Sequence, residues 1–216
     1  GTVSYMSPEQ ALGQDVSRLQ GERDKVADDL ALAEEQLAEL ERKRAIAGRA
    51  IEFLQGGESI YLDGSTTCGE LSKLLATAGK SFLVVTDSLY VLLELNDKKN
   101  IEMLLLGGML GKDGNTFDGV LTVENARKMM VDCCFFSARG FSPEQISNAG
   151  MTGSQVKQLM IRQARKRYLL ADSTKYGHKG IFKICDWDEV DVLISDDGLP
   201  ESELAELRKT TEIHRA

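Results

Sequence analysis

The chain has 216 residues, of which 42% are hydrophobic and 28% are charged, a composition typical of one globular domain with an appendage. A formal net charge of −8 without a basic block makes the chain by itself a poor binder of nucleic acid. No apolar run approaches the roughly 18 residues that a membrane span requires, and no apolar signal segment follows the first residues. We therefore expect a cytoplasmic protein that has no membrane partner.

The four cysteines of the chain are spaced for neither a metal site nor a C-x-x-C redox motif. Neither His178 nor His214 completes a metal-ligand spacing with them. Two cysteines are adjacent within an expected strand, so their side chains should point to opposite faces of a sheet. We expect free thiols, no metal and no cofactor. The cysteines are Cys68, Cys133, Cys134 and Cys185.

Residues 1–56 carry a heptad pattern of apolar side chains, and no proline follows Pro8 in this segment. A pattern kept over about six repeats is typical of a coiled-coil seam. Two interpretations stay open: a long dimerisation helix, or two amphipathic helices that pack on the chain's own core with a break near Gly21. The two series are Leu12, Leu19, Val26, Ala33, Leu40, Ala47 and Leu54, and Val16, Leu30, Leu37 and Ile51, with Arg23 and Arg44 interrupting the second.

From Glu58 onward, short β-rich runs alternate with helical stretches. This alternation predicts an α/β domain over residues 57–216, with a mostly parallel sheet and flanking helices. The carboxyl ends of such strands share one edge of the sheet, where ligands bind. The expected strands are 59–63, 82–86, 101–106, 133–137, 168–171 and 190–195, and the expected helices are 67–76, 89–95, 120–130, 154–167 and 201–208.

The segment after the first expected strand, Asp63-Gly64-Ser65-Thr66-Thr67, has the composition of an anion site. Small residues there direct backbone N–H groups and hydroxyls toward the positive end of the following helix, which suits phosphate. Thr67 can cap this helix, with Glu70 completing a capping box. A simple capped turn is the alternative interpretation.

Four further clusters follow other expected strands, at equivalent positions along the same edge. Taken singly, each is equally well explained as a helix cap or a flexible loop. Because all five clusters fall at one edge, we interpret them together as a ligand site. The four are Thr86-Asp87-Ser88, Gly107-Gly108, Ala138-Arg139-Gly140 and Asp172-Ser173-Thr174-Lys175.

Six motifs, in their order along the chain, resemble the C-terminal effector-binding domain of the DeoR family of bacterial transcriptional regulators. The resemblance extends from about Ala45 to the C-terminus. It implies the fold of ribose-5-phosphate isomerase and the CoA transferases, and a domain that senses phosphorylated sugars while a separate winged helix-turn-helix binds operator DNA. The motifs are Lys43-Arg44-Ala45-Ile46, Gly57-Glu58-Ser59-Ile60-Tyr61-Leu62-Asp63-Gly64-Ser65-Thr66-Thr67, Val84-Val85-Thr86-Asp87-Ser88, Leu105-Leu106-Gly107-Gly108, Leu170-Ala171-Asp172-Ser173-Thr174-Lys175 and Ile194-Ser195-Asp196-Asp197-Gly198-Leu199.

The resemblance also implies a role in effector binding for each cluster. The resemblance adds Lys157 to the site, because it matches a family position on the helix expected over residues 154–167. The phosphate would be bound by Asp63, Gly64, Ser65, Thr66 and Thr67; the sugar would face Thr86, Asp87 and Ser88; Gly107 and Gly108 would close the floor; and Lys157, Asp172 and Lys175 would complete the edge.

Two departures from the family pattern bear on the ligand. The family usually reads Ala-Asp-Gly where this chain has Ala138-Arg139-Gly140, and Thr-Asn-Ser where this chain has Asp87. Arg139 can form a bidentate contact with phosphate or carboxylate, or it can pair with Asp87 or Asp172. With Lys157 and Lys175, it predicts a cationic site in an otherwise acidic protein.

The function expected from this pattern is a sugar-phosphate-sensing regulatory domain of a repressor of sugar-metabolism genes, not an enzyme. A phosphosugar isomerase-like enzyme, with Asp172 and Lys175 transferring protons, is the alternative, and a coiled-coil scaffold is a third. The heptad segment 1–56 would make the protein a homo-oligomer, a dimer or a tetramer. Because Gly1-Thr2-Val3-Ser4 resembles the segment just after the family's DNA-binding domain, we expect operator DNA to bind only through a domain outside this chain.

Overall fold

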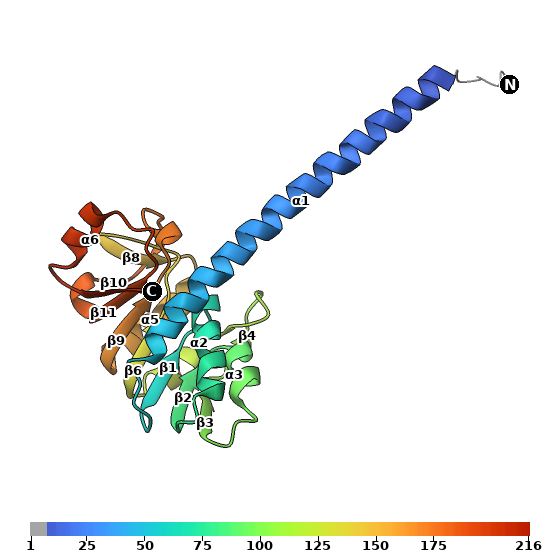
Figure 1. The fold of residues 1–216 in the computed structure, drawn as a ribbon. Coiled ribbons are helices and arrows are strands. Elements are labelled where there is room, and N and C mark those ends of the chain that lie inside the picture. The colour runs from blue at the N-terminus through green and yellow to red at the C-terminus, as the bar shows by residue number, and fades with distance from the viewer. Residues whose placement is uncertain (1–7) are drawn as a thin grey trace. The chain divides into compact units, whose positions relative to one another are not determined.

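A computed structural model of the chain describes residues 8–216 (Figure 1). The chain divides into two compact units, Gly1–Glu41 and Arg42–Ala216. The first four residues, which carry the expected link to a DNA-binding domain, lie outside the described part, as do the side chains of Leu12 and Val16 in the heptad pattern.

The helix α1 (Pro8–Ile51) is continuous and passes through Gly21 and Gly48. The expectation of two helices with a break near Gly21 is therefore wrong, because tolerating a glycine costs only about 1 kcal/mol. Within residues 17–41, the heptad side chains Leu19, Val26 and Leu30 are 57%, 66% and 58% exposed.

The last turns of α1 belong to the second unit. Ile46, Ala47 and Ala50 are completely buried, together with Leu54 beyond the helix end. They pack in one apolar cluster with β1 (Ser59–Leu62) and α2 (Thr66–Thr77). The compact unit that contains the sheet thus includes the end of α1, where the heptad residue Ala47 is completely buried, whereas the heptad residue Leu37 is 54% exposed.

A seven-stranded sheet forms the centre of this unit, and all of its strand pairs are parallel. The observed sheet and its flanking helices match the fold class expected from the sequence (Figure 1). The strands, in their order across the sheet, are β12 (Glu212–Arg215), β11 (Val192–Ser195), β9 (Ala164–Leu170), β6 (Val131–Phe136), β1, β2 (Phe82–Thr86) and β3 (Ile101–Leu105).

Alternate residues of the strands supply two separate apolar cores, one on each face. Ile60 and Leu62 face α1, α2 and α3 (Leu89–Leu95), whereas Tyr61 faces the opposite layer. That second layer is built from α4 (Val120–Ala126), α5 (Met151–Arg162) and α6 (Glu201–Leu207). Cys133 and Cys134 lie in different clusters, so the expected opposite orientation of the two thiols is confirmed.

Several short elements are absent from the sequence-based prediction. The antiparallel sheet β10-β8-β7 packs beside α5, and a two-stranded ribbon β4-β5 follows β3. The expected helix 154–167 ends at Arg162, because residues 164–167 pair with β6 as the start of β9. The additional elements are β4 (Met109–Leu110), β5 (Phe117–Asp118), β7 (Gly140–Ser142), β8 (Gln145–Asn148), β10 (Phe182–Cys185), η1 (Ser173–Lys175), η2 (Trp187–Glu189) and the edge strand β12 of the main sheet.

Candidate functional site

The strand order reverses its direction between β1 and β6. From β1 the sheet grows through β2 and β3 on one side, and from β6 through β9, β11 and β12 on the other. Ligands of open parallel sheets bind outside the carboxyl ends of the strands at such a reversal. Asp63 directly follows β1, Ser137 directly follows β6, and Asp87 follows β2. These three residues therefore mark the candidate site.

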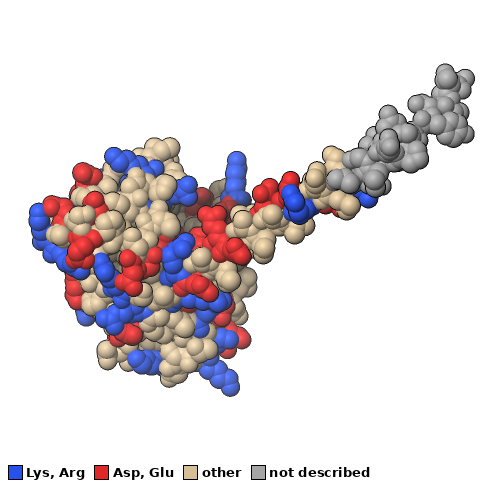
Figure 2. All heavy atoms as spheres, turned by 45° about the horizontal axis from the view of Figure 1, so that its top comes forward, with Lys and Arg blue, Asp and Glu red and all other residues tan. Residues whose placement is uncertain are grey.

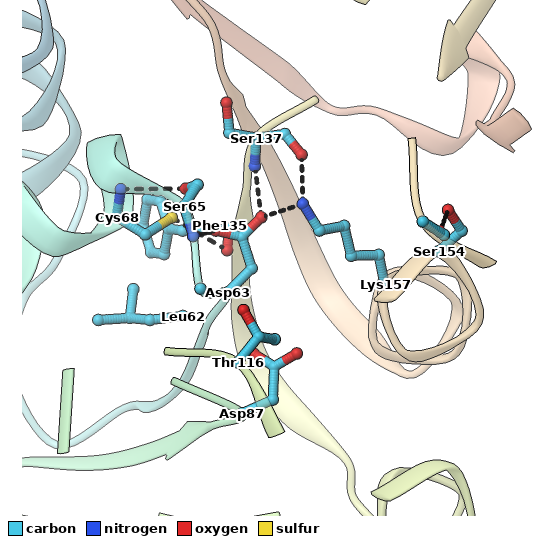
Figure 3. Close-up of polar contacts among 12 residues, drawn as sticks. Leu62, Asp63, Ser65, Cys68, Asp87, Thr116, Phe135, Ser137, Ser154 and Lys157 are labelled. Carbon is cyan, nitrogen blue, oxygen red and sulfur yellow. Dashed lines mark hydrogen bonds and ion pairs between the residues drawn. The ribbon is translucent and has the colours of Figure 1, made fainter. Parts of the chain in front are cut away.

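The Asp63 carboxylate is completely buried and accepts three hydrogen bonds. Its Oδ1 accepts from the Ser65 amide at 2.9 Å, and its Oδ2 accepts from the Ser137 amide at 2.8 Å and pairs with Lys157 Nζ at 2.7 Å (Figure 3). Burial by itself raises the pKa of Asp63, but the Lys157 charge and these donors outweigh it and lower the pKa. Asp63 is thus a fixed anion of the site.

Lys157 reaches this point from α5, on the face opposite α2. Its Nζ also donates to the Ser137 carbonyl at 2.7 Å, so β1, β6 and α5 are joined at one ammonium group (Figure 3). Burial lowers the pKa of Lys157, but the Asp63 carboxylate more than offsets this and raises it. The predicted placement of Lys157 at the strand edge is what the structure shows. Ser137 was not predicted, since nothing in the run 133–137 distinguishes it from a strand residue.

The loop between β1 and α2 forms a capped helix start. The cap is Ser65, whose Oγ accepts from the Cys68 amide at 3.3 Å. The expected capping box of Thr67 and Glu70 is wrong, because the helix begins one residue earlier and Glu70 pairs with Arg44 and Lys73 instead.

Two residues of the first turn of α2 keep polar groups without a partner. The amides of Thr66 and Thr67 occupy the first turn, where a helix provides no carbonyl acceptor. Thr67 Oγ1 is buried and has no hydrogen-bond partner among the described residues. Thr66 is exposed and Gly64 is half-buried against Thr116. This loop therefore presents donors to an external acceptor at the positive end of a helix.

The cluster after β2 contains two hydroxyl groups that hydrogen-bond to the backbone and one carboxyl group. Thr86 Oγ1 donates to the Leu62 carbonyl at 2.7 Å, and Ser88 Oγ caps α3 by accepting from the Val91 amide at 3.3 Å. Asp87 is 1% exposed and accepts from the Tyr61 hydroxyl at 3.2 Å. Burial, together with the nearby Asp63 charge, raises the pKa of Asp87 to about 7. Tyr61, which the sequence analysis did not select, is the side-chain donor to this carboxyl group.

The β4-β5 ribbon brings Asn115 across the candidate site. Asn115 Nδ2 donates to the Gly64 carbonyl at 3.0 Å, and its Oδ1 accepts from Ser88 Oγ at 2.8 Å. Asn115 thus ties the loop after β1 to the loop after β2. Asn115 was not predicted, although Asp113-Gly114 just before it is a turn signal that could have located the ribbon.

Gly107 and Gly108 are held by their own chain. Both have positive φ angles, of 68° and 121°, which favour glycine. The Gly107 carbonyl accepts from Thr122 Oγ1 at 2.6 Å, and a Cβ on Gly108 would collide with Thr122. The structure therefore explains Gly107 by its backbone conformation and Gly108 also by close packing on α4, and Gly108 is exposed.

Arg139 and Gly140 have different environments after β6. Arg139 is exposed, and within residues 17–216 no ion pair joins it to Asp87 or Asp172, the partners that we considered for it. Its amide donates to the Ser147 carbonyl at 2.9 Å, which holds the backbone but leaves the guanidinium in solvent. Gly140 is buried where its backbone approaches His178, so a side chain there would collide.

Asp172 caps the short helix η1 after β9, and Lys175 is the last residue of this helix. The buried Asp172 carboxylate accepts from the Thr174 amide at 3.1 Å and lies 4.0 Å from Lys175 Nζ. Lys175 donates to Ser137 Oγ at 2.7 Å, so Ser137 contacts both Lys157 and Lys175. Burial lowers the pKa of Lys175, and the Lys157 charge acts in the same direction while Asp172 opposes them. The structure thus brings the two lysines together at Ser137.

Other kinds of site find little support in the part of the chain that the structure describes. No three residues among its His, Cys, Asp and Glu side chains are grouped to hold a metal ion. None of its helices combines the length and the apolar character needed to cross a bilayer. On the face shown in Figure 2, acidic and basic side chains are interspersed rather than gathered into a basic patch.

Comparison with known protein families gives a match over most of the chain. Residues 38–197 match the family described as the DeoR C terminal sensor domain. The transcriptional regulator GolR of Listeria innocua is 32% identical over 73% of this chain and 62% of its own length. The transcriptional repressor GlcR of Bacillus subtilis is 32% identical over 72% of this chain and 60% of its own length. The chain thus spans about three fifths of the length of these relatives.

Solved structures show a likeness of fold. The translation initiation factor eIF-2B of Pyrococcus horikoshii matches 76% of this chain and 65% of its own, with a TM-score of 0.51 and 16% identity. Ribose 5 phosphate isomerase A of Neisseria gonorrhoeae matches 62% of this chain and 52% of its own, with a TM-score of 0.46 and 19% identity. The likeness to the initiation factor shows a shared fold alone, so function must be argued from the site.

Proposed function

Because this chain belongs to the DeoR C-terminal sensor domain family, we propose that it is the ligand-sensing part of a transcriptional regulator and that its ligand is a phosphorylated sugar or a related phosphometabolite. Its relatives carry the names of regulators and repressors, which supports a regulatory function. Operator DNA would be bound by another part of a longer protein, and expression of sugar-metabolism genes would be repressed.

The observation that carries the ligand class is the first turn of α2. Its free amides lie at the positive end of a 12-residue helix, directly after the strand at which the sheet order reverses. The amines of Lys157 and Lys175 lie at the same edge, both in contact with Ser137. Backbone donors with nearby ammonium groups are the groups that phosphate oxygens prefer. A sugar attached to the phosphate would then extend toward Asp87 and the loop after β2.

The geometry around Asp63, at the end of β1, does not suit a catalytic base. Asp63 is held as an anion by Lys157, with its pKa lowered, so it has little tendency to take a proton from a substrate. This favours ligand binding without turnover. One observation supports the isomerase alternative: the pKa of Asp87, at about 7, suits a general base. Incubation with an aldose phosphate or a ketose phosphate, followed by proton NMR, separates the two, because a sensor leaves the compound unchanged.

A pair of substitutions at Thr66 tests the phosphate position. Thr66 is exposed at the first position of α2, so its side chain can be changed without disturbing the core. Thr66→Glu places a negative charge where the phosphate would lie, and a carboxylate at a helix start does not destabilise the helix. Thr66→Gln has nearly the same size and no charge.

The two variants are compared by isothermal titration with the phosphorylated sugar that best stabilises the parent. We expect Thr66→Glu to lose at least about tenfold in affinity, equal to about 1.4 kcal/mol, while Thr66→Gln stays close to the parent. The melting temperature of Thr66→Glu without ligand should not fall. Equal affinities of the Glu and Gln variants would place the phosphate elsewhere.

A further inference from the structure

Two buried aspartates occupy neighbouring strand ends at the centre of the candidate site. In the parallel pair β1-β2, Tyr61 is opposite Val85 and Leu62 is opposite Thr86. Asp63 and Asp87 are the next residues on the two strands, on the face of the sheet that carries Tyr61 and Val85. In Figure 3 the Asp63 side chain points to Lys157, whereas Asp87 lies below it, beside Thr116, and both aspartates are at most 1% exposed.

The Lys157 ammonium group forms an ion pair with only one of these two aspartates. Lys157 Nζ is 2.7 Å from Asp63 Oδ2, and its other acceptor is the Ser137 carbonyl. Asp87 has the Tyr61 hydroxyl as its side-chain donor, on Oδ1, and no ion pair within the described residues. Two neighbouring buried carboxylates cannot both ionise freely, so the one without a cation retains its proton more readily.

We propose that Asp87 is a ligand-binding residue that acts as a neutral carboxylic acid, and that a proton is taken up on Asp87 when an anionic ligand binds. The proton comes from solvent and resides on the carboxyl oxygen that Tyr61 does not contact. From there the O–H group donates a hydrogen bond to an oxygen of the ligand. This inference rests on the proposed function, because it requires a phosphorylated or otherwise anionic ligand at this edge.

The charge inventory around Asp87 explains why ligand and proton would bind together. The groups that face it are Tyr61 and Asp63 on β1 and Lys157 on α5. Farther along the same edge, the negative charge of Asp172 offsets the positive charge of Lys175. With Asp87 ionised, these five charged groups sum to −1, and with Asp87 neutral they sum to zero. A ligand whose sugar lies against an ionised Asp87 would bring its phosphate dianion into a buried site of like charge, whereas the protonated form adds no charge and offers the ligand a donor.

An asparagine in place of Asp87 distinguishes a titrating carboxylic acid from a donor that cannot titrate. Asn has the size of Asp and can donate a hydrogen bond, but it cannot titrate. Asp87→Asn therefore mimics the form of Asp87 that we expect in the complex. Asp97→Asn, a substitution of the same kind at an exposed turn, is the matched control.

The decisive experiment counts protons by isothermal titration of the full chain at pH 7.5 in two buffers of different ionisation enthalpy. The probes are a phosphorylated sugar and inorganic phosphate, which separates a phosphate ester from free phosphate as the bound species. Because a group with a pKa of about 7 is about three-quarters ionised at pH 7.5, the parent should take up as much as about three-quarters of a proton more than Asp87→Asn. Taking the difference removes any proton that the ligand itself exchanges. Asp97→Asn should match the parent.

The proton count and the binding of the two probes separate failure of this inference from failure of the proposed function. An equal proton count in the parent and in Asp87→Asn, or release of a proton that depends on Asp87, would overturn this inference while leaving the proposed function intact. If neither probe binds the parent, both the inference and the proposed function fail.

A second readout does not depend on the proton count. Affinity of the parent should fall by about tenfold per pH unit above pH 7.5, since the proton must be taken from an increasingly basic solvent. Affinity of Asp87→Asn should stay flat over the same range. Tyr61→Phe removes a donor that favours the ionised form, so the pH at which affinity starts to fall should move upward. A midpoint that does not move in Tyr61→Phe, or a parent curve as flat as that of Asp87→Asn, contradicts the inference.

Discussion

Lys157 Nζ lies 2.7 Å from Asp63 Oδ2, and the two side chains are 11% and 0% exposed. The pair joins a helix on one face of the sheet to the loop that starts a helix on the other face. Its third partner, Ser137, belongs to the neighbouring strand end and supplies both an amide donor and a carbonyl acceptor. The loop that would bind a phosphate is therefore fixed by a buried ion pair beneath it before any ligand arrives.

Breaking this pair should destabilise the protein strongly. Lys157→Met leaves the Asp63 carboxylate buried without a cation, which costs about 3–5 kcal/mol in the free energy of unfolding. The double variant Asp63→Asn/Lys157→Met should be less destabilised than the sum of its two single variants, because no charge is then left alone. Urea unfolding at a fixed protein concentration measures all four proteins. Arg127→Met, which breaks the exposed pair with Glu124, should cost less than about 1 kcal/mol; a similar cost for Lys157→Met would contradict the assigned role.

The pH dependence of stability should report on Asp87. Burial raises its pKa to about 7 in the folded protein, against about 3.9 in an unfolded chain. A raised folded-state pKa contributes stability that is fully present below about pH 4 and is lost as the pH rises through 7. The stability of Asp87→Asn relative to the parent should therefore increase by roughly 4 kcal/mol between pH 4 and pH 8. Urea unfolding across this range tests the prediction, and a constant difference between the two proteins would show that Asp87 is not perturbed.

Arg139 offers a test of anion recognition that is free of folding effects. Its side chain is exposed, so Arg139→Met should change the free energy of unfolding by less than about 0.5 kcal/mol. If the guanidinium contacts the ligand phosphate, affinity should fall by about 10- to 150-fold, or roughly 1.5–3 kcal/mol. Lys175→Met should weaken binding in the same range. Arg165→Met, at the amino end of β9 and away from the strand edge, is the control in isothermal titration; unchanged binding by Arg139→Met would remove Arg139 from the site.

The first unit of the chain should associate with a second copy. A helix whose heptad leucines are more than half exposed gains little stability alone, and pairing along the seam buries them. Leu30→Glu/Leu37→Glu should lower the solution mass from oligomer to monomer. Leu32→Glu is a matched control, because Leu32 is 54% exposed, like Leu37, but lies outside the heptad series. Light scattering measures the mass, and an oligomer that survives in the double variant would place the interface in the α/β unit.

The parts of the fold that local sequence determines were predictable. The strand β2 and the helix α3 have the bounds expected from sequence, because a run of β-branched and aromatic residues precedes a serine cap. The short strands β7, β8 and β10 were not predictable. They contain three or four residues each, and β10 pairs with residues more than thirty positions away, as Phe182 does with Asn148.

The same distinction holds for the site. The clusters after β1, β2 and β9 stand out in the sequence because small and polar residues follow apolar strands. Asn115 and Ser137 do not stand out, since their roles depend on contacts with Gly64 and Lys157 that only the folded chain creates. The capping error at Thr67 has a smaller cause: Ser65 and Thr67 are both good caps, and sequence alone does not choose between them.

The central claim is that this domain senses a phosphorylated ligand, and thermal unfolding with matched sugars tests it most directly. Each sugar is supplied with and without its phosphate to the same preparation of the full chain. At 100 times its Kd, a phosphorylated ligand should stabilise the fold by about 2.7 kcal/mol, and the melting temperature should rise accordingly. The unphosphorylated member of the pair should leave it unchanged. Equal shifts by both members of a pair, or no shift with any phosphorylated sugar in the panel, would contradict the account.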